Sequence, residues 1–577
     1  MVGNMSWTDN PGPQARPTQS QRLVGLTDSL KLWHTPGLDA LITLDINGHE
    51  EHWPVRSRGF NEWLARRFYT EYRSVPNSQA KQDALLVIEG KAVYEGDMHD
   101  SAVRLAEQDG VIYLDLANED WEVVEITSIG WTIIPSSPVK FMRKKGMQEL
   151  PRPEKGGSIT DLRRFINIQT DADWLLCVAW LLGAIRPDGP YPVLVLHGEQ
   201  GSAKSTAARV LKRLLDPNMA DLRSEPKEPR DLMITASNSW CIGLDNISRI
   251  PAWLSDALCR LSTGGGFGTR TLYQNDEETI FDAKRPIILN GIEEIAVRGD
   301  LLDRAIVLYL PSISKQQRRP ERDFWQDFDR SSPRILGAVL DAVVMALRDV
   351  DEISLGELPR MADFALWGAA SMPALGFDTD SFMNAYNGNR DGANSLVLES
   401  SPIYLFLQAI ADKEVWQGTA TELLDRLNRM ADDLTQRQRS WPKSPRALSN
   451  SLRRLAPNLR EAGIDIIHEQ TSGTKSVKSI TIRKMGESFD AKDACGAPEA
   501  PASQSAESVA DFPPVSKPGS FGCSCPGQRS TPAKFMKLAC NHGEGYGCPA
   551  CGGCRNPACS SALAGPYVAW SLPAQLR

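Results

Sequence analysis

The sequence predicts an α/β protein whose central domain is a parallel β-sheet with crossover helices. Residues 153–350 alternate short apolar runs, typical of buried strands, with amphipathic helical stretches. Within them, a glycine-containing loop joins the apolar run 191–196 to a helix. The composition is that of a globular chain, with 41% hydrophobic and 24% charged residues, which excludes a wholly disordered or collagen-like protein.

The 577 residues allow about four domains at roughly 150 residues each. Before the core, a Pro-, Gln- and Ser-rich start gives way to alternating strand-like runs, and after it come helices, a hairpin pattern and an Ala/Pro/Ser-rich stretch. We therefore predict, in chain order, a disordered lead-in (1–25), an α+β accessory domain (26–152), the α/β core (153–350), a helical lid or connector (351–415), a winged-helix-like domain (416–484), a flexible linker (485–520) and a cysteine-rich tail (521–577).

Charge and hydropathy restrict the class of partner. With 64 basic and 72 acidic residues the net charge is 64 − 72 = −8, which excludes a uniformly basic nucleic-acid coat and leaves only local basic patches. The longest apolar run, 174–185, is too short to span a bilayer, and residues 1–22 lack the apolar core of a signal peptide. We expect a cytoplasmic protein without a membrane partner.

The loop after the run 191–196 has the residues that a phosphate-binding loop needs. Glycines let backbone N–H groups turn toward phosphate oxygens, Lys204 can reach the β- and γ-phosphates of ATP, and the Ser205 hydroxyl can bind Mg²⁺. Ala203 stands where the usual pattern has a glycine before the lysine. The predicted nucleotide-binding residues are Gly198, Glu199, Gln200, Gly201, Ser202, Ala203, Lys204, Ser205 and Thr206.

Three further residues follow the loop in an order that suits ATP hydrolysis. Asp245 ends a second apolar strand, where a carboxylate can hold Mg²⁺ with Ser205 or through water, and Asn290 ends a third, where it can orient the attacking water. Arg304 precedes a fourth strand and could reach the γ-phosphate of a neighbouring subunit. Taken singly, Asp245 could cap a turn and Arg304 could pair with Asp303.

Two segments are candidates for DNA contact. Between Asp245 and Asn290, a glycine-rich stretch carries Arg270, Lys284 and Arg285, which could grip a strand backbone or simply join two core strands. Residues 437–484 hold eleven Lys or Arg against three Asp or Glu, in the helix–helix–hairpin order of a winged helix. There Arg453 and Arg454 are the candidate DNA-binding pair; a solvated basic face on a packing module is the alternative.

The motifs GEQGSAKST, LDN, STGGG with RTLY, the strand ending in Asn290, and DLLDRA resemble in order those of superfamily 3 helicases, and most of all the helicase halves of phage, plasmid and poxvirus primase-helicases. Residues 156–311 carry this resemblance. Residues 30–484 also look like a family of prophage-associated bacterial ATP-binding proteins, through SDALCRLSTGGGF and LPRMADFALW. The resemblance implies an AAA+-type ring ATPase in which Lys204 and Ser205 bind phosphate and Mg²⁺, Asp245 is the magnesium carboxylate, Asn290 the polar sensor and Arg304 the finger.

The chain departs from this pattern at Asn246, which stands where such ATPases usually have a second acidic residue, so the catalytic base is unidentified. In the accessory domain Asp45, His49, Glu50 and His52 suggest a metal or primase site. No second acidic cluster follows them, and we interpret them as structural.

The tail concentrates seven of the eleven cysteines. A C-x₂-C knuckle and its neighbours bring the candidate ligands to eight, enough for two tetrahedral zinc sites. An iron–sulfur cluster and a tail without metal are the alternatives. The last cysteine spacing does not fit the usual iron–sulfur motif, which makes that cluster the less favoured metal. The candidate zinc ligands are Cys523, Cys525, Cys540, His542, Cys548, Cys551, Cys554 and Cys559.

The leading hypothesis is a DNA replication ATPase of a phage or mobile element, which assembles as a homo-oligomeric ring, hydrolyses ATP with Mg²⁺ and moves on or remodels single-stranded or forked DNA. A non-translocating ATP-dependent switch with a regulatory or defence role is the second hypothesis. The third is the helicase half of a primase-helicase; a bifunctional primase-helicase would in addition require catalytic carboxylates in the accessory domain.

Overall fold

The structure is a computed structural model that describes residues 16–485 except 248–249, 271–277, 282–283, 292–298, 439 and 471–477; for 267–270, 278–281 and 470 it describes the backbone alone. All described residues belong to one compact unit, residues 1–491. The predicted linker beyond residue 485 and the cysteine-rich tail lie outside the described residues. Among the helices described, none is both long enough and apolar enough to cross a membrane.

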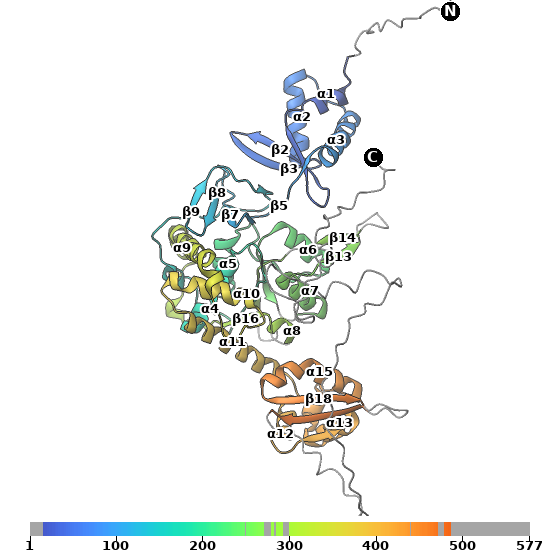
Figure 1. Cartoon of the computed structure of the whole chain (residues 1–577), viewed down its shortest axis with the longest axis vertical. Helices are drawn as coiled ribbons and strands as arrows, with labels where there is room; N and C mark the ends of the chain where they lie inside the picture. Colours follow the sequence, from blue (N-terminus) through green and yellow to red (C-terminus); the bar gives the residue numbers. More distant parts are fainter. Residues whose placement is uncertain are drawn as a thin grey trace, which may run out of the picture. The chain divides into compact units, whose positions relative to one another are not determined.

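The first domain packs helices on a four-stranded sheet of order β3-β2-β1-β4. Its helices α1, α2 and α3 and its strands β2 and β3 are labelled in Figure 1. Residues 19–25, predicted as part of a disordered lead-in, form a helix, so that prediction is wrong for them. Thr18 and Gln21 form a capping box that begins this helix, and Leu23 is fully buried in the core of the domain. The elements are α1 (Gln19–Gly25), β1 (Lys31–His34), β2 (Ala40–Ile46), β3 (His49–Pro54), α2 (Arg58–Tyr72), α3 (Ser78–Tyr94) and β4 (Asp97–Met98).

A four-stranded antiparallel meander follows, made of β6 (Leu105–Gln108), β7 (Val111–Asp115), β8 (Val123–Thr127) and β9 (Gly130–Ile134); β5 (Ser101–Ala102) pairs with β10 (Lys140–Phe141). The meander shares its hydrophobic core with the long helix α9 (Glu321–Asp349) of the next domain. Trp131 also donates a 2.7 Å hydrogen bond to Asp341 of that helix. The predicted boundary at residue 152 therefore does not separate two hydrophobic cores.

The central domain contains the predicted parallel sheet, in the order β12-β15-β11-β16. Its strands are β11 (Val193–His197), β12 (Ile242–Ile247), β15 (Ile287–Gly291) and β16 (Ala305–Tyr309). Because all four are parallel, their carboxyl ends meet at one edge of the sheet, which is where such sheets bind ligands. The strand before the predicted phosphate loop, β11, lies inside the sheet between β15 and β16.

Helices cover this sheet, and a two-stranded hairpin leaves it after α7. One hydrophobic cluster joins α4, α5, α9 and α10, and a second joins the other sheet face to the C-terminal helices. The elements are η1 (Ile159–Arg164), α4 (Asp171–Gly183), α5 (Lys204–Leu215), α6 (Pro229–Asn238), α7 (Ala252–Thr263), β13 (Phe267–Arg270), β14 (Glu278–Phe281), α8 (Gly299–Leu302), η3 (Lys315–Gln317), α10 (Ala362–Ser371) and α11 (Thr379–Glu399).

The C-terminal domain has the helix, helix and hairpin expected from the sequence, preceded by one more helix and a short strand (Figure 1). Its sheet has the order β17-β19-β18, so the first strand pairs with the last. The leucines of α15 at 448, 452, 455 and 459 are buried at helical spacing, which leaves its opposite face outward. The elements are α12 (Tyr404–Ala411), β17 (Trp416–Gly418), α13 (Ala420–Met430), α14 (Asp433–Arg437), α15 (Pro445–Glu461), β18 (Ile464–Gln470) and β19 (Lys478–Lys484).

Candidate nucleotide-binding site

The predicted phosphate loop, residues 198–206, leaves the carboxyl end of β11 and enters α5. Gly198, Gly201 and Ala203 have positive φ angles of 147°, 84° and 63°. A Cβ at Gly198 would lie 2.1 Å from the carbonyl oxygen of Leu310, so only glycine fits there. Left-handed residues just before a helix turn successive N–H groups toward one side, which is a geometry that binds anions.

Lys204 closes over this loop. Its Nζ donates to the carbonyl oxygens of Gly198 at 2.6 Å and Glu199 at 2.8 Å, and lies 3.3 Å from the Ser202 hydroxyl. Burial lowers the pKa of Lys204, and the nearby Asp245 carboxylate opposes that shift. A cation held only by neutral oxygens of its own loop is available to an anionic ligand.

Ser205, Asp245 and Asn290 come together in one polar cluster. The Ser205 hydroxyl donates to Asp245 Oδ1 at 2.9 Å, and Asn290 Nδ2 donates to Ser205 Oγ at 2.9 Å and to Asp245 Oδ1 at 2.5 Å. Asn290 is 2% exposed. Because β15 lies between β11 and β12, the strand order places the amide between the loop and the carboxylate.

The oxygens of this cluster fit Mg²⁺. A serine hydroxyl and a carboxylate in contact are the hard oxygen ligands that Mg²⁺ takes in phosphate-loop proteins, with water and phosphate completing its shell. Groups of three or more His, Cys, Asp or Glu side chains suited to a metal ion are absent from the described part of the chain. Ser205 and Asp245 would therefore hold Mg²⁺ together with water and phosphate, and not as part of a site made of protein ligands alone.

Asn246 lies beside Asp245 in a β-bulge and has a φ of 55°. Asparagine accepts this left-handed conformation better than most side chains. Its side chain is exposed, so it is outside the cluster of Ser205 and Asn290. The local backbone thus gives a physical reason for asparagine at the position where a second acidic residue was expected.

A hollow of about 730 Å³ opens beside the loop. It is lined on one side by residues 163–168, which precede the first strand of the sheet, and on the other by residues around Arg318 and Trp325; Gly201, Ala203 and Thr206 of the loop complete it. Its volume is in the range of small-molecule sites. Apolar side chains and arginines that converge beside a phosphate loop suit a nucleoside and its phosphates.

Asn167 fastens both walls of this hollow to the loop. Its Nδ2 donates to the carbonyl oxygen of Pro311 at 2.6 Å and to that of Ser202 at 3.2 Å. Asn167 and Arg318 were missed by sequence reasoning because neither belongs to a motif. Only tertiary packing brings residues 144 positions apart to the same contact.

Arg304 lies at the other edge of the sheet. Val193 pairs with Ala305 at the amino ends of β11 and β16, whereas the loop follows the carboxyl end of β11. Arg304 Nη1 donates to the carbonyl oxygen of Asp300 at 2.8 Å, and its Nε is enclosed without a hydrogen-bond partner in the described residues. Asp303 pairs instead with Arg360. Within one chain the arginine thus does not join the Ser205 cluster.

Two of the three candidate DNA-binding residues in the core, Lys284 and Arg285, already have partners within the protein. Lys284 pairs with Asp188 at 2.6 Å. Arg285 donates to the carbonyl oxygens of Ala236 and Ser239, both at 3.1 Å, and its guanidinium lies 5.2 Å from the centre of the Trp240 ring. We therefore withdraw Arg285 from the candidate interface and assign it a packing role. Arg270 pairs through its backbone with residue 278 in the β13–β14 hairpin, where the structure describes the backbone alone.

The outward face of α15 presents the other candidates. Arg453 and Arg454 are both exposed, and Arg446 lies two turns earlier on the same helix. Arg453 is close enough to His468 of β18 to help lower the pKa of that imidazole, although burial is the larger cause. The α15 face that carries Arg453 therefore lies next to strand β18 of the hairpin.

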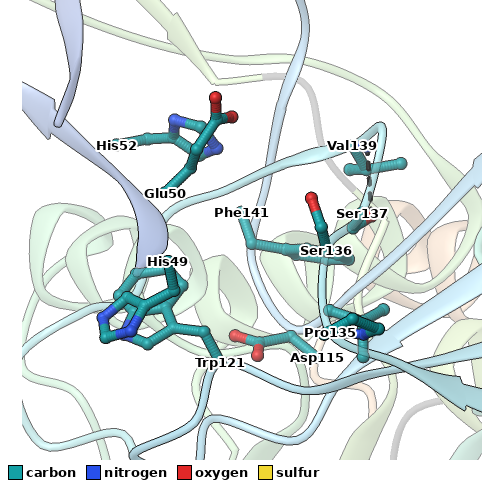
Figure 2. Close-up of a pocket in the computed structure, with 11 residues that line it drawn as sticks. His49, Glu50, His52, Asp115, Trp121, Pro135, Ser136, Ser137, Val139 and Phe141 are labelled. Carbon is teal, nitrogen blue, oxygen red and sulfur yellow. Dashed lines mark hydrogen bonds between the residues drawn. The ribbon is translucent and has the colours of Figure 1, made fainter. Parts of the chain in front are cut away.

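The histidines of β3 face a small hollow, shown in Figure 2. Its volume is about 30 Å³, too small for a nucleotide. His52 shares a 2.9 Å hydrogen bond with Thr43, and burial lowers its pKa to about 4. His49 lies 3.1 Å from Glu51, and Glu50 pairs with Lys31 at 2.6 Å.

His49, Glu50 and His52 thus each have a side-chain partner within the protein. Asp115, which lines the same hollow, pairs with Arg143 at 2.7 Å. The predicted zinc ligands from Cys523 to Cys559 lie outside the described residues.

Comparison with known proteins gives a family. Residues 159–394 match the model of the actinomycete integrative conjugative element replication protein, and residues 402–499 match the model of the C-terminal domain of that replication protein. A search of curated proteins finds no match.

The two solved structures described next are only weakly similar to this chain. "The A form apo structure of NrS-1 C terminal region-CTR" is 12% identical, with 79% of this chain and 97% of that chain covered and a TM-score of 0.36. "The apo structure of NrS-1 C terminal region (305-718)" is 11% identical, with 81% and 99% covered and a TM-score of 0.35. Scores this low support nothing further about the chain.

The two matched models describe one family and together cover more than half of the 577 residues. The chain is therefore a replication protein of a mobile element. It belongs to the replication-protein family of actinomycete integrative conjugative elements.

Proposed function

We propose that this replication protein is a Mg²⁺-dependent ATPase that moves on or remodels DNA during replication of its element. The observation that carries the proposal is the contact of Ser205, Asp245 and Asn290 at the carboxyl edge of a parallel sheet, directly beside a loop of left-handed residues. The strand order, with the loop strand inside the sheet and the Asn290 strand next to it, supports an AAA+-type core of the superfamily 3 kind.

Each residue has a task in this mechanism. The loop N–H groups hold the α- and β-phosphates, and Lys204 exchanges its carbonyl partners for β- and γ-phosphate oxygens. Ser205 and Asp245 would hold Mg²⁺, which when bound neutralises charge on the phosphates. Asn290, fixed by its two hydrogen bonds, can orient the attacking water. Arg304, at the far edge of the sheet, would act on the γ-phosphate of a neighbouring chain in a ring.

The C-terminal domain is the proposed DNA-binding part. Its order of helix, strand, three helices and hairpin supports a winged helix, in which α15 is the helix that would enter or follow a DNA groove. Exposed Arg453 and Arg454 supply phosphate contacts. Since this face is basic in a chain of net charge −8, the contact would be local.

A non-translocating ATP-dependent switch is the second candidate, and Asn246 favours it. Its exposed side chain cannot polarise water as a second carboxylate would, so ATP turnover could be too slow for a motor. The primase-helicase alternative receives less support, because His49, Glu50 and His52 are held by neighbouring side chains around a hollow of about 30 Å³.

One experiment separates these functions: ATP hydrolysis with and without single-stranded DNA, combined with strand displacement on a forked duplex. A helicase gives DNA-stimulated turnover and displaced strand. A switch gives ATP-dependent DNA binding without displacement. Binding of neither ATP nor DNA would refute the proposal as a whole.

For the tail we propose two zinc sites made by its seven cysteines and His542. Metal analysis should find close to two zinc ions per chain, and removal of residues 521–577 should abolish the zinc while ATP turnover persists. Zinc that survives the truncation, or iron in its place, would contradict this assignment.

A further inference from the structure

We infer that Arg318 is a second cation of the nucleotide site, which contacts the β-phosphate from within the same chain. The inference rests on the proposed ATPase function and extends it to a residue outside the loop motif and away from the sheet-edge position of Arg304. Its basis is where the guanidinium lies, what fixes the segment that carries it, and which neighbouring cations are already paired.

The guanidinium lies against the loop itself. Arg318 Nη2 is 3.6 Å from the position that a Cβ on Gly201 would occupy, and Arg318 lines the same hollow as Gly201 and Thr206. The backbone of such loops holds the α- and β-phosphates. A cation that lies beside Gly201 is therefore within reach of a β-phosphate held by the loop.

The segment that carries Arg318 is fastened to the loop at several points. Leu310 donates its N–H to the carbonyl oxygen of His197 at 2.8 Å, and Ile313 donates to that of Gly201 at 3.2 Å. Asn167 ties the carbonyl oxygens of Pro311 and Ser202 together. The turn η3 then brings Arg318 back over the loop. These bonds hold the backbone that leads to Arg318 against the loop in the absence of any nucleotide.

Most of the other arginines around this hollow have carboxylate partners, and the guanidinium of Arg164 lies 5.5 Å from the centre of the Phe165 ring. Arg319 pairs with Asp327, Arg322 with Asp323, and Arg209 faces Glu321 at 3.7 Å. Arg318 has no hydrogen bond or ion pair with any of the residues that the structure describes. An exposed arginine without a carboxylate, held over a phosphate loop, has the charge and the planar donor geometry that suit a phosphate group.

The consequence is a division of tasks between two arginines. Arg318 acts in its own chain on the β-phosphate, so it contributes to binding of both ATP and ADP. Arg304, acting from the next chain, would contribute to turnover. The protein would thus hold ADP through Arg318 after the γ-phosphate has left.

The test is calorimetric titration of the full chain with ATP, ADP and AMP in the presence of Mg²⁺. Arg318→Ala should weaken ADP and ATP binding by about 10- to 100-fold, the range expected for one charge-assisted hydrogen bond. AMP binding should change little because AMP lacks the β-phosphate. Arg318→Lys should recover part of the loss. The matched control is Arg322→Ala, which removes an arginine of the same surface that is already paired.

Each outcome has a distinct meaning. ADP affinity unchanged in Arg318→Ala, or AMP affinity reduced as much as that of ADP, would overturn the inference, since the residue would then not contact the β-phosphate. A wild-type chain that binds none of the three nucleotides would overturn the proposed function itself. Equal urea midpoints for all three variants and the wild type establish that the loss is not one of folding.

Discussion

Replacement of Asp216 by alanine should strongly lower the free energy of unfolding of the protein. Asp216 follows α5, the helix that begins at the phosphate loop, and its side chain is 1% exposed. It accepts hydrogen bonds from Arg104 at 3.3 Å and Lys212 at 3.1 Å, and from the backbone N–H groups of Trp240 at 2.9 Å and Cys241 at 3.2 Å. The carboxylate thus joins the meander, α5 and the start of β12.

The expected loss follows from what the substitution leaves behind. Arg104 is 0% exposed and the Lys212 side chain 3% exposed, so two cations would remain buried without their counter-ion. Breaking a buried pair costs about 3–5 kcal/mol, and each orphaned N–H about 1–3 kcal/mol more. These terms are not additive, and we expect a total loss of at least about 4 kcal/mol. Asp216→Asn, which keeps an acceptor for the N–H groups, should lose less.

The assay is urea unfolding followed by tryptophan fluorescence, with the midpoint and slope giving the free energy of unfolding. The control is Asp188→Ala, whose carboxylate pairs with Lys284 but is 73% exposed and should matter by less than about 1 kcal/mol. An Asp216→Ala protein within about 1 kcal/mol of wild type would refute the reasoning.

The pH dependence has a definite sign. Burial raises the pKa of Asp216, but Lys212 and Arg104 outweigh it, so the folded-state pKa lies below the usual 3.8. The contribution of this carboxylate to stability is therefore present above pH 3.8 and lost only as the pH falls through the lower, folded-state value.

Three other predictions concern separate parts of the chain. Replacing Arg453 and Arg454 together by alanine should weaken DNA binding for all sequences and flatten its salt dependence, by about 0.7 units of log–log slope per lost contact on single strands; an unchanged slope would return α15 to a packing role. Lys204→Ala and Arg304→Ala chains, each inactive alone, should recover ATP turnover when mixed, and inactive mixed oligomers would place Arg304 outside the neighbouring site. Because burial lowers the pKa of His52 to about 4 from 6.5, the unfolded chain alone takes up its proton between these values, so stability should fall by up to about 2 kcal/mol from pH 7 to pH 5; His52→Asn should reduce that loss, and an identical pH dependence in the variant would contradict it.

The part of the site that the sequence could predict lies in local pattern. The loop, Asp245 and Asn290 each follow an apolar strand, and parallel strands bring their carboxyl ends together, so the cluster with Ser205 could be expected from the sequence alone. The hairpin β18–β19 could also be predicted, from the alternation of apolar and polar residues and from the turn-forming residues between the two strands.

What the sequence could not predict depends on long-range packing. Arg104 and Asp216 are 112 positions apart, and nothing in either segment marks them as partners. Arg285 is basic and follows a glycine-rich stretch, yet its guanidinium turns inward to backbone oxygens and Trp240. Residues 19–25 have too few apolar residues to suggest a helix, yet a capping box begins one and Leu23 packs into the core of the first domain.

The central claim, that the loop at residues 198–206 hydrolyses ATP, is tested most directly by phosphate release from Mg²⁺-ATP by the wild-type chain and by Lys204→Ala. Lys204 contacts only oxygens of its own loop, so its removal should leave the urea midpoint nearly unchanged while phosphate release falls to background. Phosphate release at the wild-type rate by a folded Lys204→Ala protein would contradict the assignment of this loop as the ATPase site.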